Sequence, residues 1–246
     1  MRALRMFAVA ALMTTAGCTF THAAERVDLI LVLAADVSNS MKESNFWLQR
    51  LGYAAAFSNP QVIAAIRAGT SGRIAVALVE WSGIAQQKVV IDWTMISNDE
   101  TARQFGSRIM EEPRAFDKNS TSISAGIDFA TAQLDRAPYE ARRRAIDVSG
   151  DGDNNSGRDV TAARDEAVAK GITINGLVIL SQTQMSSNSD HANEHTNPPG
   201  GLADYYRNNV IGGPGAFVMV AENASSFGNA LVKKLIAEIA QKLPQR

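Results

Sequence analysis

Cysteine and histidine are scarce in this chain. Its 246 residues include one Cys, Cys18, and three His. With one thiol the chain cannot form an internal disulfide, and it cannot build a zinc or iron–sulfur site from several cysteines. We therefore expect the folded protein to be stabilised by its hydrophobic core or by another kind of metal site.

A strong charge imbalance is also absent. The chain has 24 Lys and Arg residues and 25 Asp and Glu residues, which gives a net charge of -1. There is no basic excess to recruit nucleic acid or acidic lipids, so we expect no nucleic-acid partner. A hydrophobic content of 46% and a charged content of 20% are ordinary for a globular protein and exclude a wholly disordered or collagenous chain.

The beginning of the chain has the pattern of a secretory signal peptide. Arg2 and Arg5 precede a short apolar run, Phe-Ala-Val-Ala-Ala-Leu-Met, and small residues follow as far as Ala24. The run is too short to span a bilayer as a helix of the mature protein. We therefore expect residues 1–24 to be a signal peptide, the protein to be exported to the periplasm or the cell exterior, and the mature chain to have no transmembrane segment.

A second interpretation of the same region stays open. Thr15-Ala16-Gly17-Cys18 resembles the box of a bacterial lipoprotein, in which the cysteine is lipidated and becomes the new N-terminus. Thr15 stands where that box usually has Leu. Cleavage after Ala23 or Ala24 predicts a soluble exported protein, whereas lipidation predicts a protein with a lipid anchor at Cys18.

Nearly continuous apolar runs alternate with helical periodicity along the rest of the chain, and such runs predict parallel strands buried on both faces. We expect strands over 27–35, 73–81, 144–149, 172–180 and 215–220, with 87–93 as an antiparallel partner of the second. We expect helices over 43–57, from 60 to a stop at Gly69, and over 121–134, 159–170, 202–209 and 225–243. The fold class is α/β: a single domain over 25–246 with a doubly wound, mostly parallel open sheet of the Rossmann-like kind, flanked by helices and with one antiparallel edge strand.

Two helices carry more specific predictions. The predicted buried stripe of the helix over 43–57 consists of Trp47, Leu51, Ala54 and Ala55. Ser97 and Glu100 have the spacing of a capping box, which predicts that another helix begins there.

Oxygen-bearing side chains gather where strands or loops meet helices. Asp36, Ser38 and Ser40 follow the first apolar strand, Thr121 opens a helix, and Asp151 follows another apolar strand. In open α/β sheets the binding site lies beyond the carboxyl ends of the strands, where the strand order reverses. Carboxylates and hydroxyls suit a hard cation such as Mg²⁺, Mn²⁺ or Ca²⁺, and Mg²⁺ readily keeps a coordination position open to an outside oxygen.

These segments resemble the von Willebrand factor type A domain. The Asp-x-Ser-x-Ser stretch from Asp36 to Ser40, Thr121 and the Ser-Gly-Asp-Gly stretch from Ser149 to Gly152 match its metal-ion-dependent adhesion site in order and in place. The resemblance extends from about Val27 to the final helix. Phrases such as RIAVALVEW, IDVSGDG and VIGGPGAFV resemble an uncharacterised family of exported bacterial proteins with this domain.

The resemblance implies a role for each of the five residues. Ser38, Ser40 and Thr121 would bind the metal through their hydroxyls. Asp36 and Asp151 would bind it directly or through water. In the wider family a carboxylate of a partner protein completes the coordination, so the resemblance implies a protein partner that presents a carboxylate.

Two positions depart from the usual pattern of that site. Asn39 stands where Gly is common, and Asn tolerates a left-handed backbone. Ser149-Gly150-Asp151 stands where Thr-Asp-Gly is usual, which leaves the position of the aspartate open. Neither departure removes a candidate ligand.

Three functions are compatible with this pattern. The favoured one is an exported, non-enzymatic binding module that uses a divalent cation to hold an acidic group of a protein partner. The second is a metal-dependent hydrolase of phosphate esters, although no second carboxylate follows Asp36 at two residues and no His, Lys or Cys is an evident acid or base. The third is a scaffold whose metal site is structural or vestigial.

Other motifs are interpreted as ordinary structure. The stretch from Asp151 has Ser156 and Ala162 where an EF-hand loop needs Gly and Glu, so an EF-hand is rejected. Asp153 is interpreted as a solvated turn residue. His191 and His195 lie in a polar segment without a convincing third ligand and are predicted to be surface residues.

Overall fold

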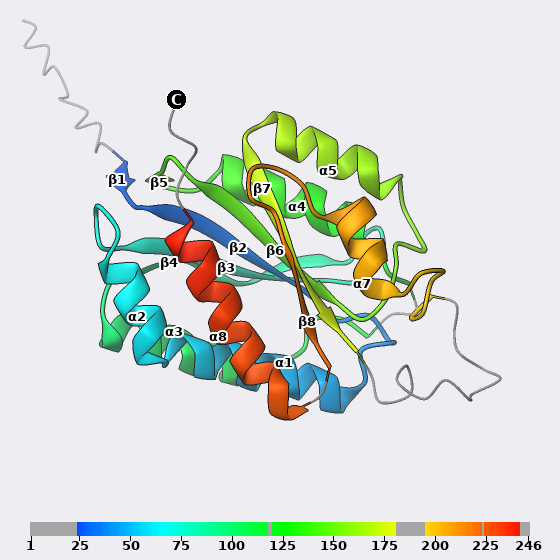
Figure 1. Ribbon diagram of the computed structural model, residues 1–246, viewed down its shortest axis with the longest axis horizontal. Helices are drawn as coiled ribbons and strands as arrows, with labels where there is room; N and C mark the ends of the chain where they lie inside the picture. Colours follow the sequence, from blue (N-terminus) through cyan, green and yellow to red (C-terminus); the bar gives the residue numbers. More distant parts are fainter. Residues whose placement is uncertain (1–23, 118–119, 181–194, 223, 242–246) are drawn as a thin grey trace, which may run out of the picture.

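A six-stranded sheet forms the centre of the molecule in the computed structural model (Figure 1), which describes residues 24–117, 120–180, 195–222 and 224–241. Its strand order is β4-β3-β2-β6-β7-β8. The strands are β2 (Leu29–Asp36), β3 (Ile74–Trp81), β4 (Gln87–Ile96), β6 (Arg144–Gly150), β7 (Ile172–Ile179) and β8 (Val218–Ala221). All neighbouring pairs are parallel except β3 and β4, which are antiparallel, so the predicted sheet with one antiparallel edge strand is confirmed.

Helices cover both faces of this sheet (Figure 1). One face carries α1 (Glu43–Phe57), α2 (Pro60–Arg67), α3 (Asp99–Glu111) and α8 (Ala224–Ala240). The other carries α4 (Ile123–Asp135), α5 (Val160–Ala169), α7 (Leu202–Tyr205) and a π-helical turn at Tyr206–Val210. A separate parallel pair joins β1 (Glu25–Arg26) to β5 (Tyr139–Glu140). This is the predicted α/β architecture with helices on both sides of the sheet.

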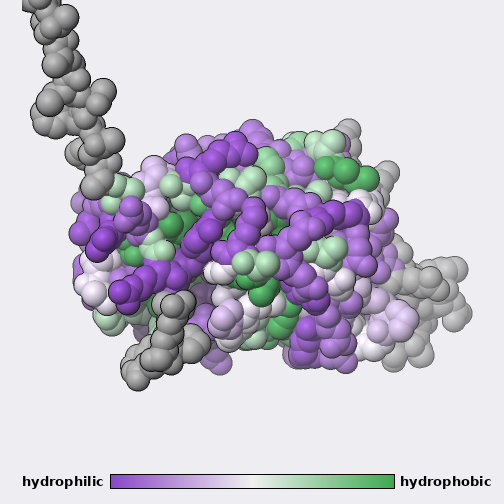
Figure 2. Space-filling view, turned by 90° about the horizontal axis from the view of Figure 1, so that it is seen from above, coloured by the Kyte–Doolittle hydropathy of each residue, from purple (hydrophilic) through white to green (hydrophobic). Residues whose placement is uncertain are grey.

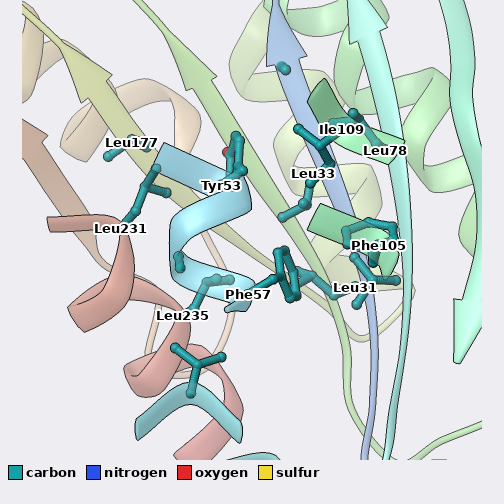
Figure 3. Close-up of a cluster of buried hydrophobic side chains, with 14 of the residues drawn as sticks. Leu31, Leu33, Tyr53, Phe57, Leu78, Phe105, Ile109, Leu177, Leu231 and Leu235 are labelled. Atoms are coloured by element: carbon teal, nitrogen blue, oxygen red, sulfur yellow. The ribbon is translucent and has the colours of Figure 1, made fainter. Parts of the chain in front are cut away.

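The sheet is buried because its strands are apolar on both faces. All eight residues of β2 are buried, and so are all eight of β3. Leu31 and Leu33 of β2 contribute to the core between the sheet and α1, where the rings of Phe57 and Phe105 meet edge to face at 4.8 Å (Figure 3). Because side chains alternate along a strand, Ile30, Val32 and Ala34 contribute to the second core under α4 and α5.

The buried face of α1 differs from the predicted one. Trp47 is 40% exposed and Leu51 is 54% exposed, so the predicted stripe is wrong. The helix instead turns Phe46, Arg50, Tyr53 and Phe57 inward, together with Gln49 and Ala56. The apolar pattern misleads here because a charged residue belongs to the buried face: the guanidinium of Arg50 is buried in an ion pair with Glu80.

The start of α3 is also shifted from the prediction. Asn98, not Ser97, caps the helix: its side chain accepts a 2.9 Å hydrogen bond from the backbone of Thr101. The hydroxyl of Thr101 accepts the reciprocal bond from the Asn98 backbone at 3.2 Å, so Thr101 fills the place predicted for Glu100. Asn stabilises a helix N-terminus as well as Ser does. The helix can therefore begin one residue later than predicted with little loss of stability. The other predicted strands and helices are present, with small shifts at their ends.

One outer face of the molecule is largely polar. Figure 2 shows the outer face over α4, α5 and α7 as mainly hydrophilic, with hydrophobic residues scattered between polar ones. No described helix combines the length and the apolar character that crossing a membrane requires. The predicted signal peptide and Cys18 lie outside the described residues, apart from Ala24.

Candidate functional site

The candidate site lies where β2 and β6 end side by side. From β2 the chain proceeds to β3 on one side, whereas from β6 it proceeds to β7 on the other, so the strand order reverses between them. Asp36 is the last residue of β2, and Asp151 directly follows β6. Parallel strands place these two carboxylates at the same edge of the sheet, where the sequence predicted a site.

The segment after β2 folds back over its own carboxylate. The backbone N–H of Ser38 donates a 2.7 Å hydrogen bond to Oδ1 of Asp36, as in an Asx turn. The turn brings the hydroxyls of Ser38 and Ser40 within 3.0 Å of each other. Two of the predicted hydroxyl groups are therefore positioned by the local chain.

Thr121 and Asp151 join this pair from distant parts of the chain. The hydroxyl of Thr121 lies 3.2 Å from that of Ser38, and Ser40 donates a 2.7 Å hydrogen bond to Oδ1 of Asp151. Asn155 accepts a 2.9 Å bond from the backbone of Thr121 and so connects the loop after β6 to the start of α4. All five predicted side chains thus meet in one place.

Arg114 supports the same loop and was not predicted. Its Nη2 donates hydrogen bonds of 2.8–2.9 Å to the carbonyls of Val37, Ser38 and Met41. The three carbonyls come from the turn that carries the hydroxyls. Arg114 therefore helps to hold the turn in shape and places a positive charge near the two carboxylates.

Burial makes the two carboxylates unusual. Asp36 is 0% and Asp151 is 1% exposed. Burial, and next to it the negative charge of Asp151, raises the pKa of Asp36 to about 7. Burial also raises the pKa of Asp151, although the Ser40 hydroxyl and other neighbours oppose the shift. Two buried acids that resist ionisation form a place where a cation would be stabilised.

One oxygen of Asp36 has no hydrogen-bond partner within the described part of the chain. This atom is Oδ2, and the nearby hydroxyl of Tyr206 likewise has none. A Cβ at Gly150 would stand 3.0 Å from this oxygen and 2.6 Å from the Tyr206 hydroxyl, so only glycine leaves that spot clear. The described residues contain no group of three or more His, Cys, Asp or Glu side chains that could hold a metal. A metal here would need the hydroxyls, and this oxygen-rich set fits a hard divalent cation.

His195 lies at this site, contrary to the prediction of a surface residue. Only 13% of its side chain is exposed, and its Nε2 lies 3.0 Å from the hydroxyl of Thr121. Its Nδ1 is paired with the carboxylate of Asp153, which the sequence suggested to be a solvated turn residue. The backbone N–H of Asp153 also donates to the carbonyl of His195 at 2.9 Å. His195 lies 42 residues from Asp153 and 74 residues from Thr121 in the sequence, so no local pattern indicates these contacts. His191 lies outside the described residues.

A buried polar network also lies behind the site, and the sequence pattern did not indicate it. Gln49 donates a 2.9 Å hydrogen bond to Ser149, which precedes the site on β6. Asp147, also on β6, forms a 2.8 Å ion pair with Lys234 of α8, and Lys234 also pairs with Glu238. Burial, opposed by Lys234, raises the pKa of Glu238 to about 7. Polar side chains thus connect the strand that leads to Asp151 with two helices.

Comparison with known proteins identifies the family. Residues 26–243 match the model of a family described as a protein of unknown function, DUF1194. No curated protein matched the chain. Among solved structures, the pilus adhesin SpaC from Lactobacillus rhamnosus GG in its open conformation matches at 15% identity and a TM-score of 0.60, over 87% of this chain and 30% of the adhesin.

Two further structures are similar over the same extent. Proximal thread matrix protein 1 from the mussel byssus, with a zinc-occupied MIDAS motif, matches at 14% identity and a TM-score of 0.58, over 88% of this chain and 49% of that protein. A von Willebrand factor type A protein from Catenulispora acidiphila matches at 13% identity and a TM-score of 0.58, over 88% and 44%. This chain spans less than half the length of each of the three structures. At these identities the likeness shows the fold, and the chain belongs to the DUF1194 family and has the fold of a von Willebrand factor type A domain.

Proposed function

We propose that this domain is an exported protein-binding module that depends on a divalent cation. The ion is held by the hydroxyls of Ser38, Ser40 and Thr121, with Asp36 and Asp151 binding directly or through water. The observation that carries the proposal is the convergence of these five side chains around two buried acids, one of which has an oxygen without a partner in the described residues. Three neutral hydroxyls and two carboxylates suit Mg²⁺, with Mn²⁺ or Ca²⁺ as alternatives.

The binding chemistry follows from this donor set. The charge of a divalent ion offsets two carboxylates, and hydroxyl ligands leave it strongly attractive to a further anionic oxygen. An acidic side chain of a partner protein would enter the open position as a charge-assisted ligand. The similar structures of a pilus adhesin and of a protein with a zinc-occupied MIDAS motif support a binding role of this kind.

Export is part of the same proposal. Residues 1–24 act as the signal peptide and residues 25–246 form the single mature domain, which works in the periplasm or outside the cell. In the alternative, the exported protein is a lipoprotein that is anchored to the membrane at Cys18.

Metal binding tests the proposal directly. We expect calorimetry to show one Mg²⁺ or Mn²⁺ ion bound by the wild type and none by Asp36→Ala. Asp92→Ala, which removes an exposed carboxylate from β4, is the matched control and should bind as the wild type does. Equal metal affinity in wild type and Asp36→Ala would contradict the proposed site.

The partner requires a second measurement. Immobilised wild-type protein should retain a protein of the exported fraction with Mg²⁺ but not with a chelator, and Asp36→Ala should retain none of it. Turnover of generic phosphate esters that needs both metal and Asp36 would instead favour the hydrolase. Metal-independent retention would favour the scaffold.

A further inference from the structure

His195 faces the hydroxyl cluster from a segment that is remote in sequence from the other site residues. We propose that His195 is a further ligand of the same ion, through Nε2, and that the site therefore prefers Zn²⁺ or a similar transition-metal ion to Mg²⁺. This inference rests on the proposed metal site and names the class of ion that the site selects.

The pairing of His195 with Asp153 defines which nitrogen is available. An ionised Asp153 carboxylate can only accept, so in the neutral ring the Nδ1–H group is the donor to Asp153. Nε2 of that tautomer keeps its lone pair, and this atom is the one that lies at Thr121. A carboxylate behind an imidazole in this way is the usual arrangement of metal-binding histidines, because it orients the ring and makes the other nitrogen a better ligand.

The spacing of the atoms fits a shared ion. Neighbouring ligands with bonds of about 2.1 Å stand about 3.0 Å apart around an octahedral ion and about 3.4 Å apart around a tetrahedral one. The distance from Nε2 of His195 to Oγ1 of Thr121 is 3.0 Å, that from Thr121 to Ser38 is 3.2 Å, and that from Ser38 to Ser40 is 3.0 Å. His195 therefore stands at ligand spacing from a hydroxyl that already belongs to the set.

The backbone beside Asp151 leaves room for the ring. A Cβ at Gly152 would stand 2.5 Å from Cε1 of His195 and closer still to Nε2. Gly152 is not among the glycines with a positive φ, so alanine is compatible with its backbone. Gly152→Ala would thus displace the imidazole by steric contact while leaving histidine in the chain.

The nature of the donor decides the preferred ion. Mg²⁺ takes oxygen ligands and gains little from an imidazole, whereas Zn²⁺, Co²⁺ and Ni²⁺ bind imidazole well. An oxygen site with one added nitrogen should therefore still bind Mg²⁺, but should bind Zn²⁺ considerably more tightly. Loss of the nitrogen should weaken Zn²⁺ and leave Mg²⁺ nearly unchanged.

Calorimetric titrations of the full chain with Zn²⁺ and with Mg²⁺ test the proposal. In His195→Ala and in Gly152→Ala we expect Zn²⁺ affinity to fall by about 100-fold and Mg²⁺ affinity to change by less than about threefold. Asp153→Asn should lower Zn²⁺ affinity by about 10–100-fold, because the ring loses its acceptor. Asp204→Ala, which removes an exposed carboxylate of α7, is the control and should bind both ions as the wild type does. Zinc X-ray absorption should show imidazole scattering in the wild type and none in His195→Ala.

The outcomes separate this inference from the proposed function. If Asp36→Ala abolishes metal binding but His195→Ala and Gly152→Ala bind Zn²⁺ as the wild type does, the metal site stands and His195 is not a ligand. Equal losses of Zn²⁺ and Mg²⁺ in a folded His195→Ala also overturn the proposal, because they assign His195 a merely structural role. Unchanged metal binding in Asp36→Ala overturns both. Circular dichroism confirms that each variant is folded.

Discussion

The hydroxyl of Ser40 donates a 2.7 Å hydrogen bond to Oδ1 of Asp151, a residue 111 positions further along the chain. This bond joins the turn after β2 to the turn after β6, across the point where the strand order reverses. Both atoms belong to the proposed ligand set. The protein therefore holds the two halves of the site together before any ion is considered.

Replacing Ser40 tests this connection. Ser40→Ala removes one hydroxyl ligand and the bond to Asp151, so we expect metal affinity to fall at least about tenfold and stability to fall by about 1 kcal/mol. Ser44→Ala, at an exposed position of α1, is the matched control and should change neither quantity. Calorimetric titration and urea unfolding measure the two effects. Wild-type metal affinity in Ser40→Ala would remove Ser40 from the ligand set.

Metal binding should depend on pH through Asp36. The pKa of this carboxyl is raised to about 7, so it is mostly protonated below that pH and must lose the proton before it binds a cation. We therefore expect Mg²⁺ affinity to be weaker at about pH 6 than at about pH 8, by up to about tenfold. The comparison is a titration at both pH values. An identical Mg²⁺ affinity of the wild type at both pH values would contradict the proposed role of Asp36.

The buried acid of α8 makes a separate prediction about stability. The pKa of Glu238 is raised from 4.5 to about 7, because burial outweighs the attraction of Lys234. The folded state thus holds this proton more strongly than the unfolded state does. The resulting stabilisation is complete below about pH 4.5 and is lost as pH rises to about 7.

Glu238→Gln should remove this dependence. At about pH 8 we expect the variant to be more stable than the wild type by about 1–3 kcal/mol, since a buried charge is replaced by a neutral amide. Thermal or urea unfolding at several pH values measures the difference. Glu222→Gln, at an exposed position, should leave the pH profile unchanged. A less stable Glu238→Gln at that pH would show that the ionised carboxylate is a net stabilising partner of Lys234.

The ion pair of Arg50 with Glu80 is expected to be essential for folding stability. The side chains of both residues are almost fully buried, at 2% and 0% exposure. Arg50→Ala leaves the Glu80 carboxylate buried without its cation, so we expect a loss of about 3–5 kcal/mol. Arg67→Ala breaks a pair with Asp99 in which both side chains are about half exposed, and it should cost less than about 1 kcal/mol. Urea unfolding measures both, and equal losses would contradict this account.

The five candidate ligands could be proposed from the sequence because three segments with oxygen-bearing side chains occur in the order of the adhesion site that the chain resembles. Asp36 and Asp151 come at the ends of apolar runs, and parallel strands bring such ends to one edge of a sheet. Thr121 precedes a helix with a clear periodicity. These signals lie within a few residues of the side chains that they concern.

Arg114 and His195 carry no such signal. Arg114 lies 77 positions after Val37, whose carbonyl it binds, and His195 lies 74 positions after Thr121. In the sequence both residues stand among ordinary polar neighbours. Their importance depends on contacts that exist only when separate loops meet over the sheet.

The amino-acid sequence by itself determined the alternation of strands and helices and indicated the candidate oxygen donors, because apolar periodicity acts over short stretches of chain. Only the tertiary structure decided which polar groups are buried together. Arg50, Lys234 and His195 each lie where a charged or polar partner from another element offsets the loss of water. Such a partner offsets the free-energy cost of burial only when packing brings it within hydrogen-bond distance. The local sequence pattern does not predict that distance.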